Sequence, residues 1–215
     1  MRSSLFLACL AVAVAVPSSA LSSTLQKYLC FYNGKFTNKQ FLEQNPDSGA
    51  TKVETRVTSV YLNNISQNPF TYVEQSDNGE LVLAELGEVT EGPNERIEVT
   101  TYNLTNYIGK KLGEIEINDF RNLTRDQLHG NPGCGGSLQL VDDSRFEGDL
   151  PDCRHISSSG LRRDYTASLT CDTIIVGIPR GAAETAPNGE MTLKLEGAKF
   201  PLPDGSSCTC GNTSS

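Results

Sequence analysis

Tyr72 and Glu74 are the first side chains whose types and spacing suit ligand binding. They lie two residues apart in a segment with strand-like alternation, so both belong to one face of the strand, and Gln75 follows directly. If that face is enclosed, the Glu74 carboxylate can accept hydrogen bonds from N–H groups while Tyr72 packs against the ligand or hydrogen-bonds to it. The alternative, which the residue types alone favour, is a strand whose Tyr and Glu face water.

Two further segments supply candidate ligand-binding residues. Arg96 and Tyr102 share one face of a predicted strand, but the residues between them on that face are also polar, and such a face more often meets solvent. Asp164 and Tyr165 open a later strand, where the carboxylate could lie beside nitrogen atoms of a ligand. The alternative there is an acidic residue at a strand edge, and the sequence favours neither interpretation.

Other kinds of site are not supported by the sequence. His129 and His155 are the only histidines, and neither has the spacing of a metal ligand to another His, Cys or acid, so we expect no metal site. The segment 133–137 does not supply a Gly-x-Ser-x-Gly nucleophile elbow. Phosphate-binding and dinucleotide-binding motifs are also missing from the sequence.

The first 20 residues are predicted to be a secretory signal peptide. A basic start at Arg2 precedes an apolar run over 5–16, and small residues end the segment at Ala20. The run is shorter than the roughly 20 residues that span a bilayer, and no similar run follows, so we expect a secreted, soluble protein without a membrane span. Removing 20 of 215 residues leaves 195, enough for one domain, and changes the net charge from -8 to -9. This acidic chain should repel nucleic acid and anionic membrane surfaces.

The cysteines and glycosylation motifs agree with export. Of seven cysteines, Cys9 lies in the predicted signal peptide, and an even number remains, which indicates a disulfide set of as many as three bridges. These cysteines are Cys30, Cys134, Cys153, Cys171, Cys208 and Cys210. Asn-x-Ser/Thr motifs, of which we expect only some to be glycosylated, occur at Asn64, Asn103, Asn122 and Asn212.

The hydrophobic pattern predicts a helix followed by many strands. Residues 21–32 have helical spacing, with a capping box from Ser23 to Gln26 and a stop at Asn33-Gly34, and a second short helix is predicted over 38–44. Ser76-Asp77-Asn78-Gly79 is typical of a hairpin turn. Predicted strands cover 52–62, 70–75, 81–86, 96–104, 134–141, 145–148, 165–171, 173–178 and 191–200, and Thr124-x-x-Gln127 indicates one helical turn.

About eight to ten strands with hairpin spacing predict an all-β fold, either a sandwich or a barrel. An up-and-down barrel of this size can leave a ligand cavity inside it. We expect one domain over 21–200 and a Cys-containing tail over 201–215, with no internal repeat.

Several ordered motifs point to a known family. The opening Leu29-Cys-Phe-Tyr-Asn-Gly-Lys-Phe-Thr-Asn-Lys-Gln40 is followed by Tyr72-Val73-Glu74-Gln75 and Tyr102-Asn103-Leu104, then by Leu123-Thr124-Arg125-Asp126-Gln127-Leu128, Pro132-Gly133-Cys134, Phe146-x-Gly148 and Cys153. Together these resemble the T-type phycobiliprotein chromophore lyases, the CpcT/CpeT family, over about 25–200. The resemblance implies a lipocalin-like (calycin) antiparallel β-barrel with an N-terminal helix, which holds a bilin, an open-chain tetrapyrrole.

In that family the bilin is delivered to a cysteine of a phycobiliprotein, and the lyase positions the pigment rather than supplying a nucleophile. The resemblance also implies a disulfide between Cys134 and Cys153, and we expect Cys30 and Cys171 to bond to Cys208 and Cys210 in an order left open. Family members carry a Pro-Tyr-Arg-Gln-Arg stretch where this chain has 79–85, with neither arginine. The nearest basic replacements for binding the bilin propionates are Arg96, Arg162 and Arg163.

Three functions therefore stay open. The leading hypothesis is a secreted, lyase-like protein that binds a bilin or related linear tetrapyrrole non-covalently, with the pigment as its partner and no tightly bound cofactor. The second is an active bilin lyase with a phycobiliprotein subunit as partner. The third is an extracellular structural or matrix protein that uses the barrel as a scaffold. The sequence does not decide whether the chain is a homodimer.

Overall fold

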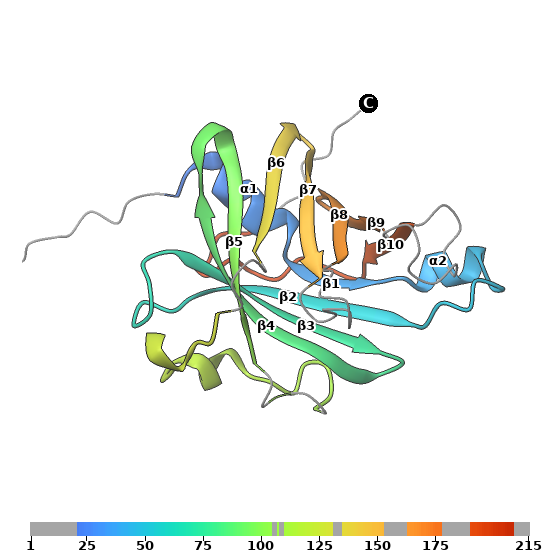
Figure 1. The fold of residues 1–215 in the computed structure, drawn as a ribbon, viewed down its shortest axis with the longest axis horizontal. Coiled ribbons are helices and arrows are strands. Elements are labelled where there is room, and N and C mark those ends of the chain that lie inside the picture. Colours follow the sequence, from blue (N-terminus) through green and yellow to red (C-terminus); the bar gives the residue numbers. More distant parts are fainter. Residues whose placement is uncertain are drawn as a thin grey trace, which may run out of the picture.

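The computed structural model describes residues 21–104, 107, 110–130, 135–152, 163–177 and 190–208, without the side chains of 150–152 and 163–164. Within these residues, ten antiparallel strands close into a barrel in the order β1-β10-β9-β8-β7-β6-β5-β4-β3-β2 (Figure 1). The strands are β1 (Gly34–Thr37), β2 (Val53–Tyr61), β3 (Pro69–Asp77), β4 (Glu80–Glu91), β5 (Arg96–Asn103), β6 (Gly136–Asp142), β7 (Arg145–Asp152), β8 (Arg163–Thr170), β9 (Thr173–Gly177) and β10 (Glu190–Leu195). The predicted all-β barrel is confirmed.

Nine of the ten strands were predicted, but several boundaries differ: β7 continues to Asp152 instead of ending at 148, and β10 ends at Leu195 instead of 200. The turn between β3 and β4 is where the sequence puts it, and Asn78 and Gly79 have positive φ angles of 50° and 90°, as a tight hairpin turn requires. Strand β4 is twice as long as predicted because both of its faces are buried over 86–89, which hides the alternation. Strand β1 was not predicted, because it lies between the predicted stop at Asn33-Gly34 and the second predicted helix. It is four residues long, too short for a periodic signal.

Two helices flank β1. Helix α1 (Ser23–Phe31) begins at the N-cap Ser22, whose hydroxyl accepts a hydrogen bond from the Leu25 amide at 3.1 Å, so the cap lies one residue before the predicted Ser23. Helix α2 (Lys39–Gln44) follows Asn38. The Asn38 side chain is fully buried and spans the α2 loop, donating to the Thr51 carbonyl at 2.8 Å and accepting from the Val53 amide at 2.9 Å.

The inside of the barrel is identified by strand register. Apolar side chains from nine of the ten strands meet in one cluster, here called the interior cluster, together with four side chains of α1. Only the enclosed face of a barrel can bring so many strands together. The buried members are Leu25, Tyr28, Leu29, Phe31, Phe36, Val53, Val89, Ile97, Val99, Leu138, Phe146, Ala167, Leu169, Ile174 and Leu193.

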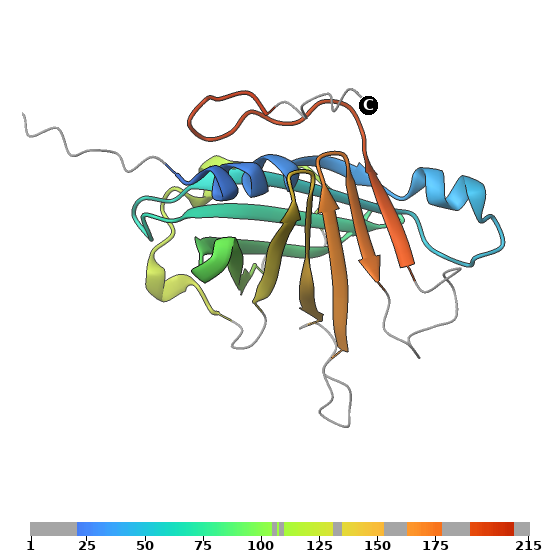
Figure 2. The ribbon, with the colours of Figure 1, turned by 90° about the horizontal axis from the view of Figure 1, so that it is seen from above.

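Helix α1 closes one end of the barrel (Figure 2). Its first turn is tied to the end of β4 by a hydrogen bond from Ser22 to Glu91, and Lys27 pairs with Asp143 in the β6–β7 turn at 3.1 Å. At its other end, the Ser59 hydroxyl of β2 donates to the Leu29 carbonyl at 3.3 Å. The helix therefore contacts three separate parts of the barrel wall.

The opposite, outer face of β2–β5 is covered by the chain after β5. This cover segment comprises the described residues of 107–130, with the 3-10 helices η3 (Ile117–Phe120) and η4 (Arg125–Gln127). Helix η4 is the single helical turn predicted at Thr124-x-x-Gln127, and Thr124 and Gln127 form a capping box. Beneath the segment lies a second cluster, the outer cluster: Val60, Leu62, Phe70, Tyr72, Leu81, Ala84, Leu86, Tyr102, Leu104, Ile115 and Phe120.

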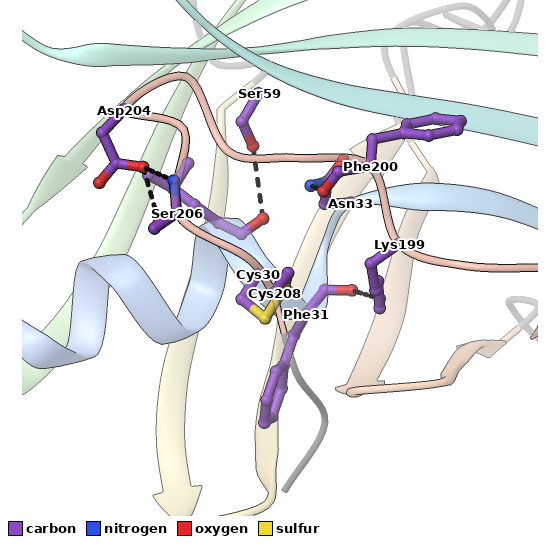
Figure 3. Close-up of a disulfide and its surroundings, with 10 residues drawn as sticks. Cys30, Phe31, Asn33, Ser59, Lys199, Phe200, Asp204, Ser206 and Cys208 are labelled. Atoms are coloured by element: carbon purple, nitrogen blue, oxygen red, sulfur yellow. Dashed lines mark hydrogen bonds between the residues drawn. A yellow bond between two sulfur atoms is a disulfide. The ribbon is translucent and has the colours of Figure 1, made fainter.

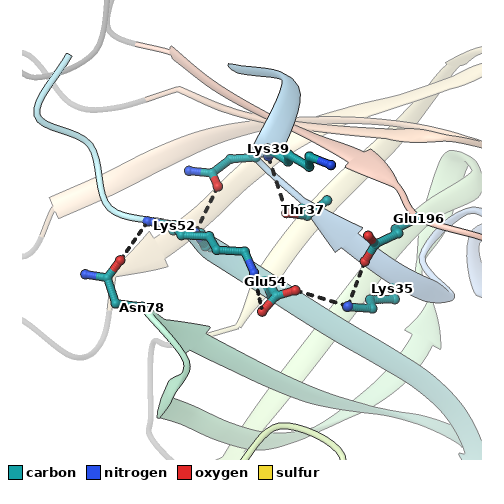
Figure 4. A network of polar contacts seen from close by, with 9 residues as sticks. Lys35, Thr37, Lys39, Lys52, Glu54, Asn78 and Glu196 are labelled. Atoms are coloured by element: carbon teal, nitrogen blue, oxygen red, sulfur yellow. Dashed lines mark hydrogen bonds and ion pairs between the residues drawn. The ribbon is translucent and has the colours of Figure 1, made fainter. Parts of the chain in front are cut away.

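Ion pairs on the barrel surface link β1 to its neighbours (Figure 4). Lys35 pairs with Glu54 of β2 at 3.0 Å and with Glu196 beyond β10 at 2.6 Å, and Lys52 pairs with Glu54 at 3.2 Å. Exposed pairs of this kind contribute less than about 1 kcal/mol each, so they fix register rather than supply stability. None of the helices among the described residues is long and apolar enough to cross a bilayer.

Candidate functional site

The barrel interior carries polar groups as well as apolar walls. Register places Thr55, Ser59 and Thr71 on the same face as the interior cluster. Ser59 and Thr71 bond to the carbonyls of Leu29 and Gly87, but the hydroxyl of Thr55 has no hydrogen-bond partner within the described chain. Thr55 is only 5% exposed. A buried hydroxyl without a partner costs free energy, so this position suits a bound water or a polar ligand atom.

Two tyrosines of α1 and one glutamate of β4 add titratable groups to this interior. The rings of Tyr28 and Tyr32 lie 5.8 Å apart, and Tyr28 is 2% exposed. Burial raises the pKa of both phenols, and the negative charge of Glu85 raises them further. Glu85 lies opposite Val73 of β3 and thus on the interior face. The phenols therefore stay protonated at physiological pH and can donate hydrogen bonds.

Several residues of the interior face are only half-buried. They are Gln75, Glu85, Thr101, Val176 and Met191. Tyr165 is also half-buried and continues the interior face of Ala167 and Leu169 on β8. The wall thus combines apolar area with amide, carboxylate, hydroxyl and phenol groups. Such a lining suits a mostly apolar ligand with several hydrogen-bonding atoms.

The structure divides the residues predicted to bind ligand between the two faces of the sheet. Gln75 and Tyr165 belong to the interior. Tyr72, Glu74 and Tyr102 belong to the outer face, beneath the cover segment. Arg96 is exposed at the start of β5, and Asp164 lies in β8 opposite Pro151.

Glu74 and Tyr72 hold the cover segment. Glu74 is fully buried, and its Oε2 accepts a hydrogen bond from the Gly113 amide at 3.1 Å and lies 3.8 Å from Nη1 of Arg56. Burial raises the pKa of the Glu74 carboxyl, although Tyr72, Gly113 and Arg56 act in the opposite direction. The Tyr72 ring packs 4.8 Å from that of Phe120. Both motif residues thus contact the cover segment, while the Tyr72 hydroxyl and Glu74 Oε1 are buried without a hydrogen-bond partner among the described residues.

A second buried carboxylate, Glu88, anchors the other end of the cover segment. Its Oε2 accepts hydrogen bonds from Arg125 at 2.6 Å and from the Tyr102 hydroxyl at 3.1 Å, and its Oε1 accepts one from Asn68 at 3.0 Å. Burial opposes ionisation, but hydrogen bonds from Ser66, Asn68, Arg125 and Tyr102 lower the pKa of Glu88 to about 2. Sequence reasoning missed Glu88 because β4 shows no alternation there.

The tail, residues 196–208, crosses the C-terminal end of α1 (Figure 3). Cys30 of α1 is bonded to Cys208, with Cα atoms 5.3 Å apart. Lys199 Nζ donates to the Phe31 carbonyl at 2.7 Å, and Asn33 Nδ2 donates to the Phe200 carbonyl at 2.8 Å. Cys171 is also disulfide-bonded.

Other predicted sites are placed as follows. Asn64 is exposed and donates from its amide to the carbonyls of Arg121 and Leu123, while Asn103 and Asn122 are exposed. The described residues contain no group of three or more His, Cys, Asp or Glu that could hold a metal. Some predictions concern residues that lie outside the described part of the chain. These residues are 1–20, Cys134, Cys153, His155, Arg162, Cys210 and Asn212.

The strand order and the lining of the interior define the structural class of this protein. It is a closed, lipocalin-like barrel with a mixed apolar and polar lining. A solved structure, the T-type phycobiliprotein lyase CpeT from the Prochlorococcus phage P-HM1, is similar with a TM-score of 0.52 and 16% identity, over 82% of this chain and 100% of that one. At this identity the likeness shows a shared fold. No family model and no curated protein matches the sequence.

Proposed function

We propose that this protein binds a linear tetrapyrrole of the bilin type, non-covalently, inside the barrel. The observation that carries the proposal is the interior itself, where Thr55 has an unpartnered hydroxyl and Glu85 and the α1 tyrosines lie against apolar walls. A bilin matches this lining because its extended conjugated system is apolar and its pyrrole nitrogens and lactam oxygens form hydrogen bonds. The shared fold with a phycobiliprotein lyase supports the same class of ligand.

We place the ligand contacts at the interior residues Gln75, Glu85, Thr101 and Tyr165 and at Thr55, which pairs with Gln75 across β2 and β3. Glu85 accepts hydrogen bonds from pyrrole N–H groups, the role that sequence reasoning gave to Glu74. Tyr72, Glu74 and Tyr102 act indirectly, by holding the cover segment on the wall of the barrel.

Export through the secretory route belongs to the same proposal. The signal-like segment 1–20 and the glycosylation motifs support it, and so does the Cys30–Cys208 bond, because disulfides persist in oxidising compartments. A secreted carrier of pigment fits these features better than a lyase whose acceptor protein stays inside the cell.

Titration with biliverdin tests the proposal. The wild-type protein should produce a shifted, sharpened visible band and an induced circular dichroism signal, because the wall holds one twisted conformer of the pigment. Glu85→Gln should weaken binding about tenfold, since a hydrogen bond to a charged acceptor contributes roughly 1.5–3 kcal/mol.

The matched control is Glu147→Gln, which changes an exposed carboxylate paired with Arg145 on the outside of β7 and should leave the affinity unchanged. Absorbance that stays that of free pigment at micromolar protein would exclude both a carrier and a lyase. If pigment binds, a phycobiliprotein subunit is added, and an acid-stable thioether adduct would identify a lyase instead of a carrier.

A further inference from the structure

The end of the barrel that α1 closes is held from outside by the tail. Helix α1 has only nine residues, with no acidic side chain in its first turn and no basic one in its last. Helices this short are marginal on their own. The position of α1 therefore depends on packing against the interior cluster and on whatever holds its two ends.

The N-terminal end of α1 is held weakly. Ser22 contacts Glu91 in an exposed hydrogen bond, and Lys27 pairs with Asp143, whose side chain is fully exposed. Contacts of this type contribute less than about 1 kcal/mol each. Apart from the packing of four α1 side chains in the interior cluster, the C-terminal end of the helix is therefore its main point of attachment.

At the C-terminal end, Ser59 of β2 donates to the Leu29 carbonyl and the Phe31 ring packs on Phe146 of β7, and the tail adds further contacts. The Lys199 amine donates to the last-turn carbonyl of Phe31 and lies 4.8 Å from the Phe36 ring, and Leu202 packs on the interior cluster. The Glu196 amide donates to the Lys35 carbonyl at 2.7 Å, which seats the start of the tail on β1. The covalent link at this end is Cys30–Cys208, which joins residues 178 positions apart.

We propose that α1 is a plug latched by the Cys30–Cys208 disulfide, and that reduction of this bond by a thiol or dithiol releases the helix from its end of the barrel. In the reaction the reductant gives two electrons and two protons to the disulfide. The S–S bond breaks, Cys30 and Cys208 become thiols, and the reductant becomes a disulfide. Both cysteines are half-buried, so small movements of the tail suffice for attack. Control of ligand access by this latch rests on the proposed function.

Hydrogen exchange on the ligand-free protein tests the latch independently of the ligand. The double variant Cys30→Ala/Cys208→Ala is compared with the wild-type protein under oxidising conditions. Amides of 26–31 should exchange at least about tenfold faster in the variant, while amides of β3 and β4 keep their protection, because a plug opens without unfolding the barrel. Unchanged exchange in α1, or equal loss of protection in α1 and β3, would overturn the proposal.

A wild-type sample provides the second arm and avoids dependence on the folding of the variant. Treatment with dithiothreitol should speed α1 exchange, and reoxidation should restore it; failure of either step contradicts the latch. Biliverdin dissociation is then measured in both redox states. Faster dissociation after reduction supports control of the interior. If α1 exchange becomes faster but pigment binds in neither redox state, the proposed function is refuted while the disulfide latch of α1 is still supported.

Discussion

Phe146→Ala is expected to lower the free energy of unfolding by about 3–5 kcal/mol. Phe146 is fully buried at the centre of the interior cluster, and its ring meets those of Tyr28 and Phe31 edge to face at 5.7 and 5.9 Å. The substitution removes buried apolar area, leaves a cavity and removes the aromatic ring against which Tyr28 and Phe31 pack. Urea unfolding followed by circular dichroism measures the change.

Val141→Ala is the control for this prediction. Val141 lies on the neighbouring strand but is 44% exposed, so its truncation should change stability by no more than about 0.5 kcal/mol. A loss below about 1 kcal/mol in the Phe146 variant would show that α1 and the barrel wall are not packed as the structure describes.

Glu88→Gln is expected to destabilise the protein by about 2 kcal/mol at neutral pH, because it removes the charged acceptor of a buried network. The folded-state pKa of Glu88 is about 2, below its ordinary value of 4.5. A lowered pKa contributes stability that is present above pH 4.5 and lost as the pH falls towards 2. The difference between variant and wild type should therefore shrink over this range when thermal unfolding is followed against pH.

Glu74→Gln is expected to behave in the opposite sense. The pKa of Glu74 is raised by burial, so its contribution is fully present below the ordinary pKa and is lost as the pH rises through the folded-state value. The glutamine keeps an acceptor for the Gly113 amide and cannot ionise. Relative to wild type, this variant should gain stability as the pH rises. If the stability differences from wild type changed with pH in the same direction for Glu88→Gln and Glu74→Gln, the environments assigned to the two carboxyl groups would be contradicted.

The sequence pattern was sufficient to predict the strands and the all-β class because these signals are local. Alternation at 52–62 and 96–104, and the turn at Asn78-Gly79, identify strands and a hairpin without tertiary information. Strand closure is not local. Only the pairing of β1 with both β2 and β10 decides between a barrel and a sandwich, and β1 is too short to be recognised.

The candidate site could be predicted only in part. Parity correctly puts Tyr72 and Glu74 on one face of a strand, but it cannot tell which face is enclosed, because both faces of β3 are buried. The outer face is covered by a segment with little periodic signal, which holds Glu74 through the backbone amide of Gly113. Glu85 carries no sequence motif, and its place inside the barrel follows from the register of β3 and β4.

Methyl NMR of the protein titrated with biliverdin tests the central claim most directly. A conjugated pigment inside the barrel should shift the methyl signals of interior residues such as Val57, Ala167 and Met191 through its ring currents. The methyls of Val82 and Val141 outside the barrel, and of Ile115 under the cover segment, should remain unshifted. Shifts confined to the exposed or covered methyls, or no shifts at all, would contradict a ligand held in the interior.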